Sequence, residues 1–150
     1  MLTYVVVALG LIILIGWIVL TFVVKKKRAE GVQVVRDRLG GDAAVKAIDD
    51  KAICRGTESG PFNNLVGMGT LGYNGSELLF VRWSPPAELK IPKADLVSHS
   101  FTVEYNGHTY KKPVLQVSYR NAEHTEGQTP GEDTVAWEVV DPDAWNEALK

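Results

Sequence analysis

Three histidines and a single cysteine are the residues of this chain best suited to metal binding or covalent catalysis. His99, His108 and His124 are scattered over segments of strand and loop character, and their spacing matches no metal-binding motif. One cysteine excludes both an internal disulfide and a four-cysteine zinc site. Arg55 follows Cys54 and would favour a thiolate, but one adjacent cation is weak support for a nucleophile. We therefore predict structural or exposed histidines, an inert thiol and no metal.

Adjacent acidic residues and one serine motif are the next candidates for chemistry. The pairs Asp49-Asp50 and Glu132-Asp133 would point to opposite faces of a strand, or would be ordinary solvated charges in a loop. The run Ser98-His99-Ser100 lacks the strand–turn–helix elbow that presents a catalytic serine. Neither arrangement predicts a catalytic pair.

A glycine-rich segment imitates a phosphate-binding loop. Gly67, Gly69 and Gly72 have the G-x-G-x-x-G spacing of such a loop, but Asn74-Gly75 and a strand-like run follow them instead of a helix. No helix N-terminus is then available to hold a phosphate. The sequence accordingly predicts no enzyme activity and no cofactor.

Charge is distributed very unevenly along the chain. Residues 1–24 carry no charged side chain, and four basic residues follow at once: Lys25, Lys26, Lys27 and Arg28. From Ala29 onward twelve basic residues stand against eighteen acidic ones, a net charge of −6. Nucleic-acid binders draw their affinity mainly from Lys and Arg on phosphates, so the acidic balance excludes that class of partner.

The uncharged segment has the length of a membrane span. Residues 2–24 would form a helix of about 35 Å, enough for a hydrocarbon core of about 30 Å. A cleaved secretory signal has its positive charge before the apolar stretch and a small-residue cleavage site after it, and neither is present. We therefore predict an uncleaved anchor in the lipid bilayer, with Tyr4 at one interface.

The basic cluster at residues 25–28 predicts the orientation of the anchor. Positive charge flanks the cytoplasmic side of membrane spans, which places the N-terminus outside and the remainder of the chain in the cytoplasm. The expected location is the inner membrane of a cell, crossed once. The same side chains also have the chemistry to attract anionic lipid headgroups.

A juxtamembrane stalk is expected over residues 25–49. Residues 29–39 predict a short helix with Val32, Val35 and Leu39 on one side, and Gly40-Gly41 ends it. This apolar face could pair with a second copy or rest on lipid, but packing on the following domain is favoured.

A domain of alternating strands is expected over residues 50–150. Asn74-Gly75 and Asn106-Gly107 each lie between two apolar runs, which predicts two tight hairpins with both turn residues at positive φ. Residues 121–133, rich in Glu, Gly, Thr and Pro, are expected to form a mobile, solvated loop. Strands are expected at 68–73, 78–83, 88–91, 97–105, 114–120 and 134–140.

The last ten residues contain the clearest helix start. Asp141 is suited to cap the N-terminus, Pro142 to the first helical position and Asp143 to the helix dipole. Trp145 and Leu149 then lie on one apolar face. The expected architecture is a small antiparallel barrel or sandwich closed by one amphipathic helix, in a mainly β (α+β) domain.

Several segments resemble a known family. Residues 69–80 (GTLGYNGSELLF) resemble the second hairpin of GRAM and bacterial PH-like domains, and residues 88–96 (ELKIPKADL) resemble the I-P-x-x-D-I step that follows it. The chain from Trp137 through Trp145 is similar to their last strand and C-terminal helix. This resemblance, over roughly residues 50–150, implies a PH-like fold, a bent antiparallel barrel capped by one helix. The chain looks most like bacterial single-pass membrane proteins with such a domain.

The resemblance also implies two competing functions. Phosphoinositide-binding PH domains carry several Lys and Arg in their first hairpin loop, whereas residues 54–66 here contain only Arg55 as a basic residue. We therefore expect a membrane-anchored adaptor that presents a protein-binding domain. The alternative is a module that reads lipid headgroups, with the pair Lys111-Lys112 as its basic contact. Trp83, beside two prolines, is a candidate docking residue, although closing the edge of the barrel is favoured for it.

Overall fold

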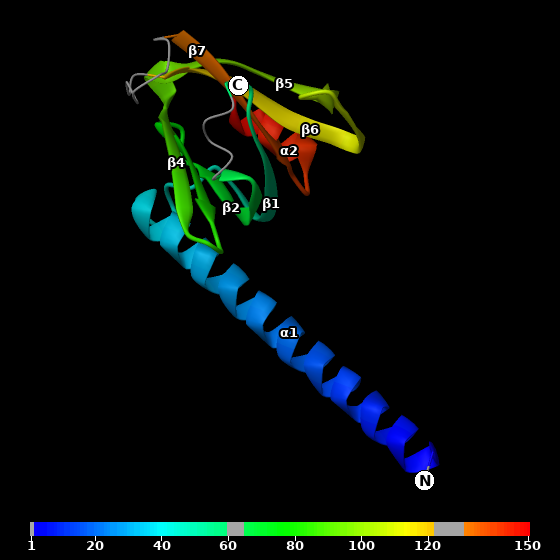
Figure 1. Ribbon diagram of the computed structural model, residues 1–150. Helices are drawn as coiled ribbons and strands as arrows, with labels where there is room; N and C mark the ends of the chain where they lie inside the picture. The colour runs from blue at the N-terminus through cyan, green and yellow to red at the C-terminus, as the bar shows by residue number, and fades with distance from the viewer. Residues whose placement is uncertain (1, 60–64, 122–130) are drawn as a thin grey trace.

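The computed structural model describes residues 2–59, 65–121 and 131–150 (Figure 1). A long N-terminal helix, α1 (Leu2–Arg38), precedes seven strands and a short C-terminal helix, α2 (Pro142–Ala148). A single 3₁₀ turn, η2 (Lys93–Asp95), joins the fourth and fifth strands. The strands are β1 (Ala47–Thr57), β2 (Gly67–Tyr73), β3 (Glu77–Arg82), β4 (Ala87–Pro92), β5 (Leu96–Tyr105), β6 (His108–Asn121) and β7 (Gly131–Glu138).

The strands form one antiparallel sheet in the order β4-β3-β2-β1-β7-β6-β5. The sheet curls into a half-barrel (Figure 1). Strands β4 and β5 lie at its two ends and do not pair with each other. Strand β1 contains a register shift between Asp49 and Ala52 and another between Cys54 and Thr57. Such irregularities increase local twist and bend a strand. They explain how β1 takes part in both halves of the curled sheet.

The core fills the inner face of the half-barrel. Alternate side chains of the strands point inward, and Phe80 and Trp137 meet there with ring centroids 6.0 Å apart. Helix α2 adds Trp145, which is 2 % exposed. Asp141 caps this helix by accepting a hydrogen bond from the backbone N–H of Ala144, and Pro142 starts it, as the sequence predicts.

The two predicted hairpin turns form by different means. Asn106 and Gly107 both have positive φ, 49° and 74°, as expected for a two-residue turn. In the other turn only Gly75 is left-handed, so the prediction for Asn74 is wrong. The Oδ1 atom of Asn74 instead accepts hydrogen bonds from the backbone N–H groups of Ser76 and Glu77, each 2.9 Å long. An asparagine side chain can therefore replace part of the backbone geometry.

The expected loop at residues 121–133 is shorter in the structure at both ends. Strand β6 extends to Asn121 and β7 begins at Gly131, and the intervening residues 122–130 lie outside the described part of the chain. Similarly, β1 begins at Ala47, before the expected domain boundary at residue 50. In both places tertiary pairing extends a strand into residues of weak strand character.

The predicted span and the predicted stalk helix are one continuous helix. α1 runs through the basic cluster without a break and ends just before Gly40, which has a φ of 96°. Its Tyr4–Arg38 part is long and apolar enough to cross a membrane, with a mean hydropathy of 2.9 over its best window. Figure 1 shows its N-terminal part projecting away from the sheet.

The C-terminal part of α1 packs on the outer face of β2 and β3. Val35 and Leu39 are buried against Leu79 there, which confirms the predicted apolar face and its packing on the domain. The helix approaches so closely that a Cβ atom at Gly72 would lie 2.4 Å from Cγ1 of Val35. A Cβ atom at Gly31 of the helix would lie 2.5 Å from Oγ1 of Thr70. Glycine is thus required on both surfaces.

Two ion pairs flank this contact. Arg28 pairs with Asp50 on β1, and Arg38 pairs with Glu88 on β4. These side chains are partly exposed, so each pair contributes little free energy by itself. Their positions on either side of the glycine contact nevertheless fix the rotation of the helix on the sheet.

The close contact at Gly72 predicts a measurable loss of stability on adding one methyl group. We expect Gly72→Ala to lower the free energy of unfolding by about 1–3 kcal/mol, because the methyl group overpacks the interface with Val35. Urea unfolding in detergent, followed by tryptophan fluorescence, measures it. Gly16→Ala is the matched control, since nothing lies within 4 Å of its Cβ position. Equal unfolding midpoints for the two variants would show that the close contact is unimportant.

Candidate functional site

Cys54 is fully buried on the inner face of β1. Burial raises its pKa to about 11, which outweighs the weaker opposite effects of a backbone hydrogen bond from Gly56 and the charges of Arg82 and Arg55. A thiol with such a pKa is protonated at neutral pH and is not a nucleophile. The thiol that the sequence predicts to be inert is therefore both buried and harder to ionise.

The acidic pairs are divided between two faces, but one prediction about them is wrong. Asp50 pairs with Arg28, whereas Asp49 is buried and accepts hydrogen bonds from the backbone N–H groups of Lys51, at 2.8 Å, and Val140. Asp133, expected as a solvated loop charge, is 6 % exposed. It belongs to β7, where the sheet itself covers it.

The buried carboxylate of Asp133 has several hydrogen-bond donors. Its oxygens accept from the hydroxyl of Ser59, at 2.6 Å, from the backbone N–H of Thr134, at 2.8 Å, and from the phenol of Tyr119, at 3.4 Å. Burial is the main cause that raises the pKa of Tyr119, so this phenol stays protonated and donates. The arrangement ties Ser59, in the segment after β1, to β7.

The histidines lie apart in the structure. His99 is half-buried on β5, His108 is exposed at the start of β6, and His124 lies outside the described residues. Over the described ranges, no group of three or more His, Cys, Asp or Glu side chains is placed to hold a metal ion. Among the described residues, the candidates His99, His108 and Cys54 come from different strands, β5, β6 and β1.

The predicted membrane-flanking residues lie along α1. Tyr4 is 82 % exposed near the start of the helix. Lys26 and Lys27 are exposed and have Glu30 at 3.9 Å and 3.7 Å. Arg28 differs from its neighbours, because its guanidinium is engaged by Asp50, a hydrogen bond that raises the pKa of Arg28. Lys25, Lys26 and Lys27 are thus the exposed basic residues of this cluster that could contact headgroups.

The other predicted contact residues are separated from one another. Lys111 and Lys112 are exposed neighbours on β6, in the stretch between Thr109 and Val114 where the pairing with β5 shifts register. Trp83 is half-buried beside α1, and its indole Nε1 donates a hydrogen bond to Oγ1 of Thr70 at 3.1 Å. Arg55, the basic residue of the first hairpin region, pairs with Glu138 and is not a free cation.

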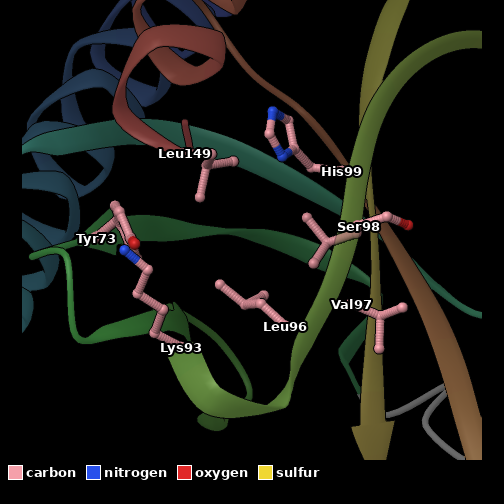
Figure 2. Close-up of a pocket in the computed structure, with 8 residues that line it drawn as sticks. Tyr73, Lys93, Leu96, Val97, Ser98, His99 and Leu149 are labelled. Atoms are coloured by element: carbon pink, nitrogen blue, oxygen red, sulfur yellow. The ribbon is translucent and has the colours of Figure 1, made fainter.

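A small cleft lies between the end strand β5 and helix α2 (Figure 2). Its volume is about 150 Å³. Leu149 reaches into it from the C-terminal end of the chain, facing Leu96 and the amine-bearing side chain of Lys93 (Figure 2). The complete lining is Tyr73, Lys93, Leu96, Val97, Ser98, His99, Val117 and Leu149.

This cleft combines the features that recognise an extended peptide. Strand β5 is an end strand of the sheet, so one side of its backbone pairs with none of the described strands and is the side that an added strand would use. The apolar floor suits one apolar side chain, while Lys93 and His99 supply positive and hydrogen-bonding groups at its rim. Binding is therefore the chemistry that the cleft supports.

The sequence did not predict the residues that line the cleft, nor the two glycines at the contact between α1 and the sheet. The sequence singles out Gly72 only as part of a glycine-rich segment, and Gly31 carries no signal at all. Lys93, His99 and Leu149 come from three separate elements, so no local motif joins them. The apolar face of the C-terminal helix was the one signal that pointed toward the cleft.

The buried thiol makes a direct prediction about reactivity. We expect Cys54 in the folded protein to resist a thiol reagent at pH 8, and to react fully once guanidinium unfolds the chain. Because folding raises the pKa of the thiol from its ordinary value of 9.0 to about 11, the free energy of unfolding should also fall as the pH rises across that interval. Absorbance of the coloured group that the thiol reagent releases measures the reactivity of Cys54. Rapid reaction of the native protein would contradict the burial.

Comparisons with known proteins show a likeness of fold alone. No protein-family model and no curated protein matches the chain. One solved structure, "The 8S snRNP Assembly Intermediate", contains a chain that is 11 % identical in sequence and aligns with a TM-score of 0.51. The alignment covers 72 % of this chain and 80 % of that one. The curled sheet is therefore an arrangement found elsewhere, and the identity is too low to carry a function with it.

Proposed function

We propose that this chain is a single-pass membrane adaptor, which holds a PH-like (GRAM-like) protein-binding domain at the cytoplasmic face of a bacterial inner membrane. The observation that carries the proposal is the continuity of α1, which runs from an apolar, exposed segment directly into a packed contact with the sheet. A domain held in this way cannot rotate freely about its anchor. Its cleft would keep a fixed direction relative to the bilayer.

Protein binding is favoured over lipid reading by the distribution of charge. Over residues 60–150, seven basic residues stand against twelve acidic ones, so an anionic bilayer would on average repel this domain. The two arginines among the candidates for a headgroup site are used otherwise, because Arg28 and Arg55 are in ion pairs. Lys111 and Lys112 then remain as one exposed basic pair in a domain of net negative charge. The three lysines before Arg28 support anchoring and orientation without requiring a specific lipid.

The partner that fits the cleft is an extended protein segment. Its backbone would pair with the free side of β5, one apolar side chain would enter beside Leu149, and a carboxylate would lie near Lys93 and His99. The domain would then bring that partner to the membrane surface. The absence of a catalytic arrangement in the described residues fits a role in binding.

The proposed orientation predicts the accessibility of two positions. In intact cells, Ser76→Cys should react with a membrane-impermeant maleimide only after permeabilisation of the inner membrane, because the domain is cytoplasmic. Tyr4→Cys should react without that treatment, since it lies on the outer side. The buried Cys54 gives no background. The reverse pattern would contradict the orientation, and extraction of the chain by alkaline carbonate would contradict the anchor.

The proposed cleft predicts crosslinking at one histidine and not at another. A photoreactive amino acid at His99 should form an adduct of defined mass with a partner in cells. The same substitution at His108, which is exposed outside the cleft, is the matched control. Lys93→Glu should reduce the adduct at position 99 by roughly tenfold, equivalent to about 1.4 kcal/mol of binding free energy. Equal adducts at both histidines, or adducts that Lys93→Glu leaves unchanged, would argue against the cleft.

A further inference from the structure

The turn between β3 and β4 has an unusual composition and position. It consists of Trp83, Ser84, Pro85 and Pro86 and contains no charged side chain. Ser84 and both prolines are exposed, whereas Trp83 is half-buried against α1. In Figure 1 this turn lies at the end of the green hairpin that faces back along α1 toward the N-terminus.

Contacts with α1 place this turn on the side of the domain nearest the apolar segment. A Cβ atom at Gly31 would lie 2.8 Å from Nε1 of Trp83, so turn and helix touch at that level. The opposite turn, between β2 and β3, contacts the far end of the helix, where Nδ2 of Asn74 donates to the carbonyl oxygen of Leu39 at 2.9 Å. The turns at the two ends of β3 therefore contact α1 at two different positions along the helix axis, near Gly31 and near Leu39.

Helix geometry converts these contacts into distances from the hydrocarbon. Gly31 stands about 10 Å along the helix axis from Val24, the last apolar residue of the span, whereas Leu39 stands about 22 Å from it. The polar layer of one leaflet is about 5–7 Å thick. The side chains of the β3–β4 turn can bridge the remaining gap, and a typical helix tilt of about 20° brings one side of the domain closer still.

The turn has the chemistry of the membrane interface. Tryptophan is enriched at the level of the headgroups, where its ring is partly buried and its N–H has a polar partner. Here that partner is Thr70. Arg82, the residue before the turn, is directed inward: its Nε donates to the carbonyl oxygen of Pro85 at 2.6 Å and its Nη1 to that of Val66 at 3.1 Å. The outer surface of the turn is therefore free of fixed charge and held in shape.

We propose that the β3–β4 turn rests on the headgroup layer of the same bilayer that α1 crosses. The inference rests on the proposed membrane anchor and adds a second contact to it. With two contacts, the domain has a fixed inclination to the membrane. The β5–α2 cleft would then open at a constant height above the bilayer.

Two serines in matching turns provide the test. Ser84→Cys and Ser76→Cys each carry an environment-sensitive fluorophore on the full-length chain, reconstituted in nanodiscs of phosphatidylcholine and phosphatidylglycerol. Both serines are exposed, and they lie at opposite ends of β3. A nitroxide on the lipid headgroup should quench the fluorophore at position 84 and leave the one at position 76 unquenched. Pro86→Asp should reduce the quenching at position 84, because an added negative charge is repelled by phosphatidylglycerol.

The outcomes distinguish failure of the turn contact from failure of the proposed membrane anchor. Incorporation into nanodiscs with equal, low quenching at both positions would overturn the turn contact while leaving the anchor intact. Failure of the chain to enter nanodiscs would overturn the anchor and this inference together. A fluorophore at Pro86→Cys provides a second probe of the same turn if the Ser84 variant folds poorly.

Discussion

The structure depends on one close contact, in which the backbone of strand β2 and the surface of α1 meet at Gly72. No side chain separates them there, so the helix lies directly on the sheet with Val35 and Leu39 buried beneath it. Gly31 repeats the arrangement from the helix side. Packing at this distance gives dispersion contacts over a continuous surface and leaves little freedom to slide or rotate. A helix that would otherwise be a tether becomes a rigid part of the domain.

The half-barrel and the docked helix divide the sheet into surfaces with different uses. The inner face is filled by the core around Trp137, and part of the outer face is covered by α1. What remains open lies between the end strands, where α2 closes one side and leaves the cleft lined by Leu149 and Lys93. An end strand beside a small apolar pocket is a natural place for another chain to bind.

Charge reinforces this division. The basic cluster at residues 25–28 lies on α1, while the domain beyond it is acidic, so positive charge is concentrated at the point where the helix leaves the apolar segment. Buried carboxylates such as Asp49 and Asp133 are satisfied by backbone N–H groups and hydroxyls, and they act as structural ties. Their burial was unexpected, because an acidic residue in a polar stretch of sequence gives no indication of the strand that will cover it.

The sequence by itself determined the features that depend on local pattern: the long apolar segment and its basic flank, most strands and the capped C-terminal helix. Period-two alternation and capping residues act within a few positions, so they can be interpreted without tertiary information. Only the tertiary structure decided that span and stalk are one helix, that Gly31 and Gly72 are its contact points, and that Lys93, His99 and Leu149 line one cleft. These residues are distant in the chain, and their relation arises from the curl of the sheet. Local periodicity specifies which face of an element is apolar, but the surface that it meets is set by packing over the whole domain.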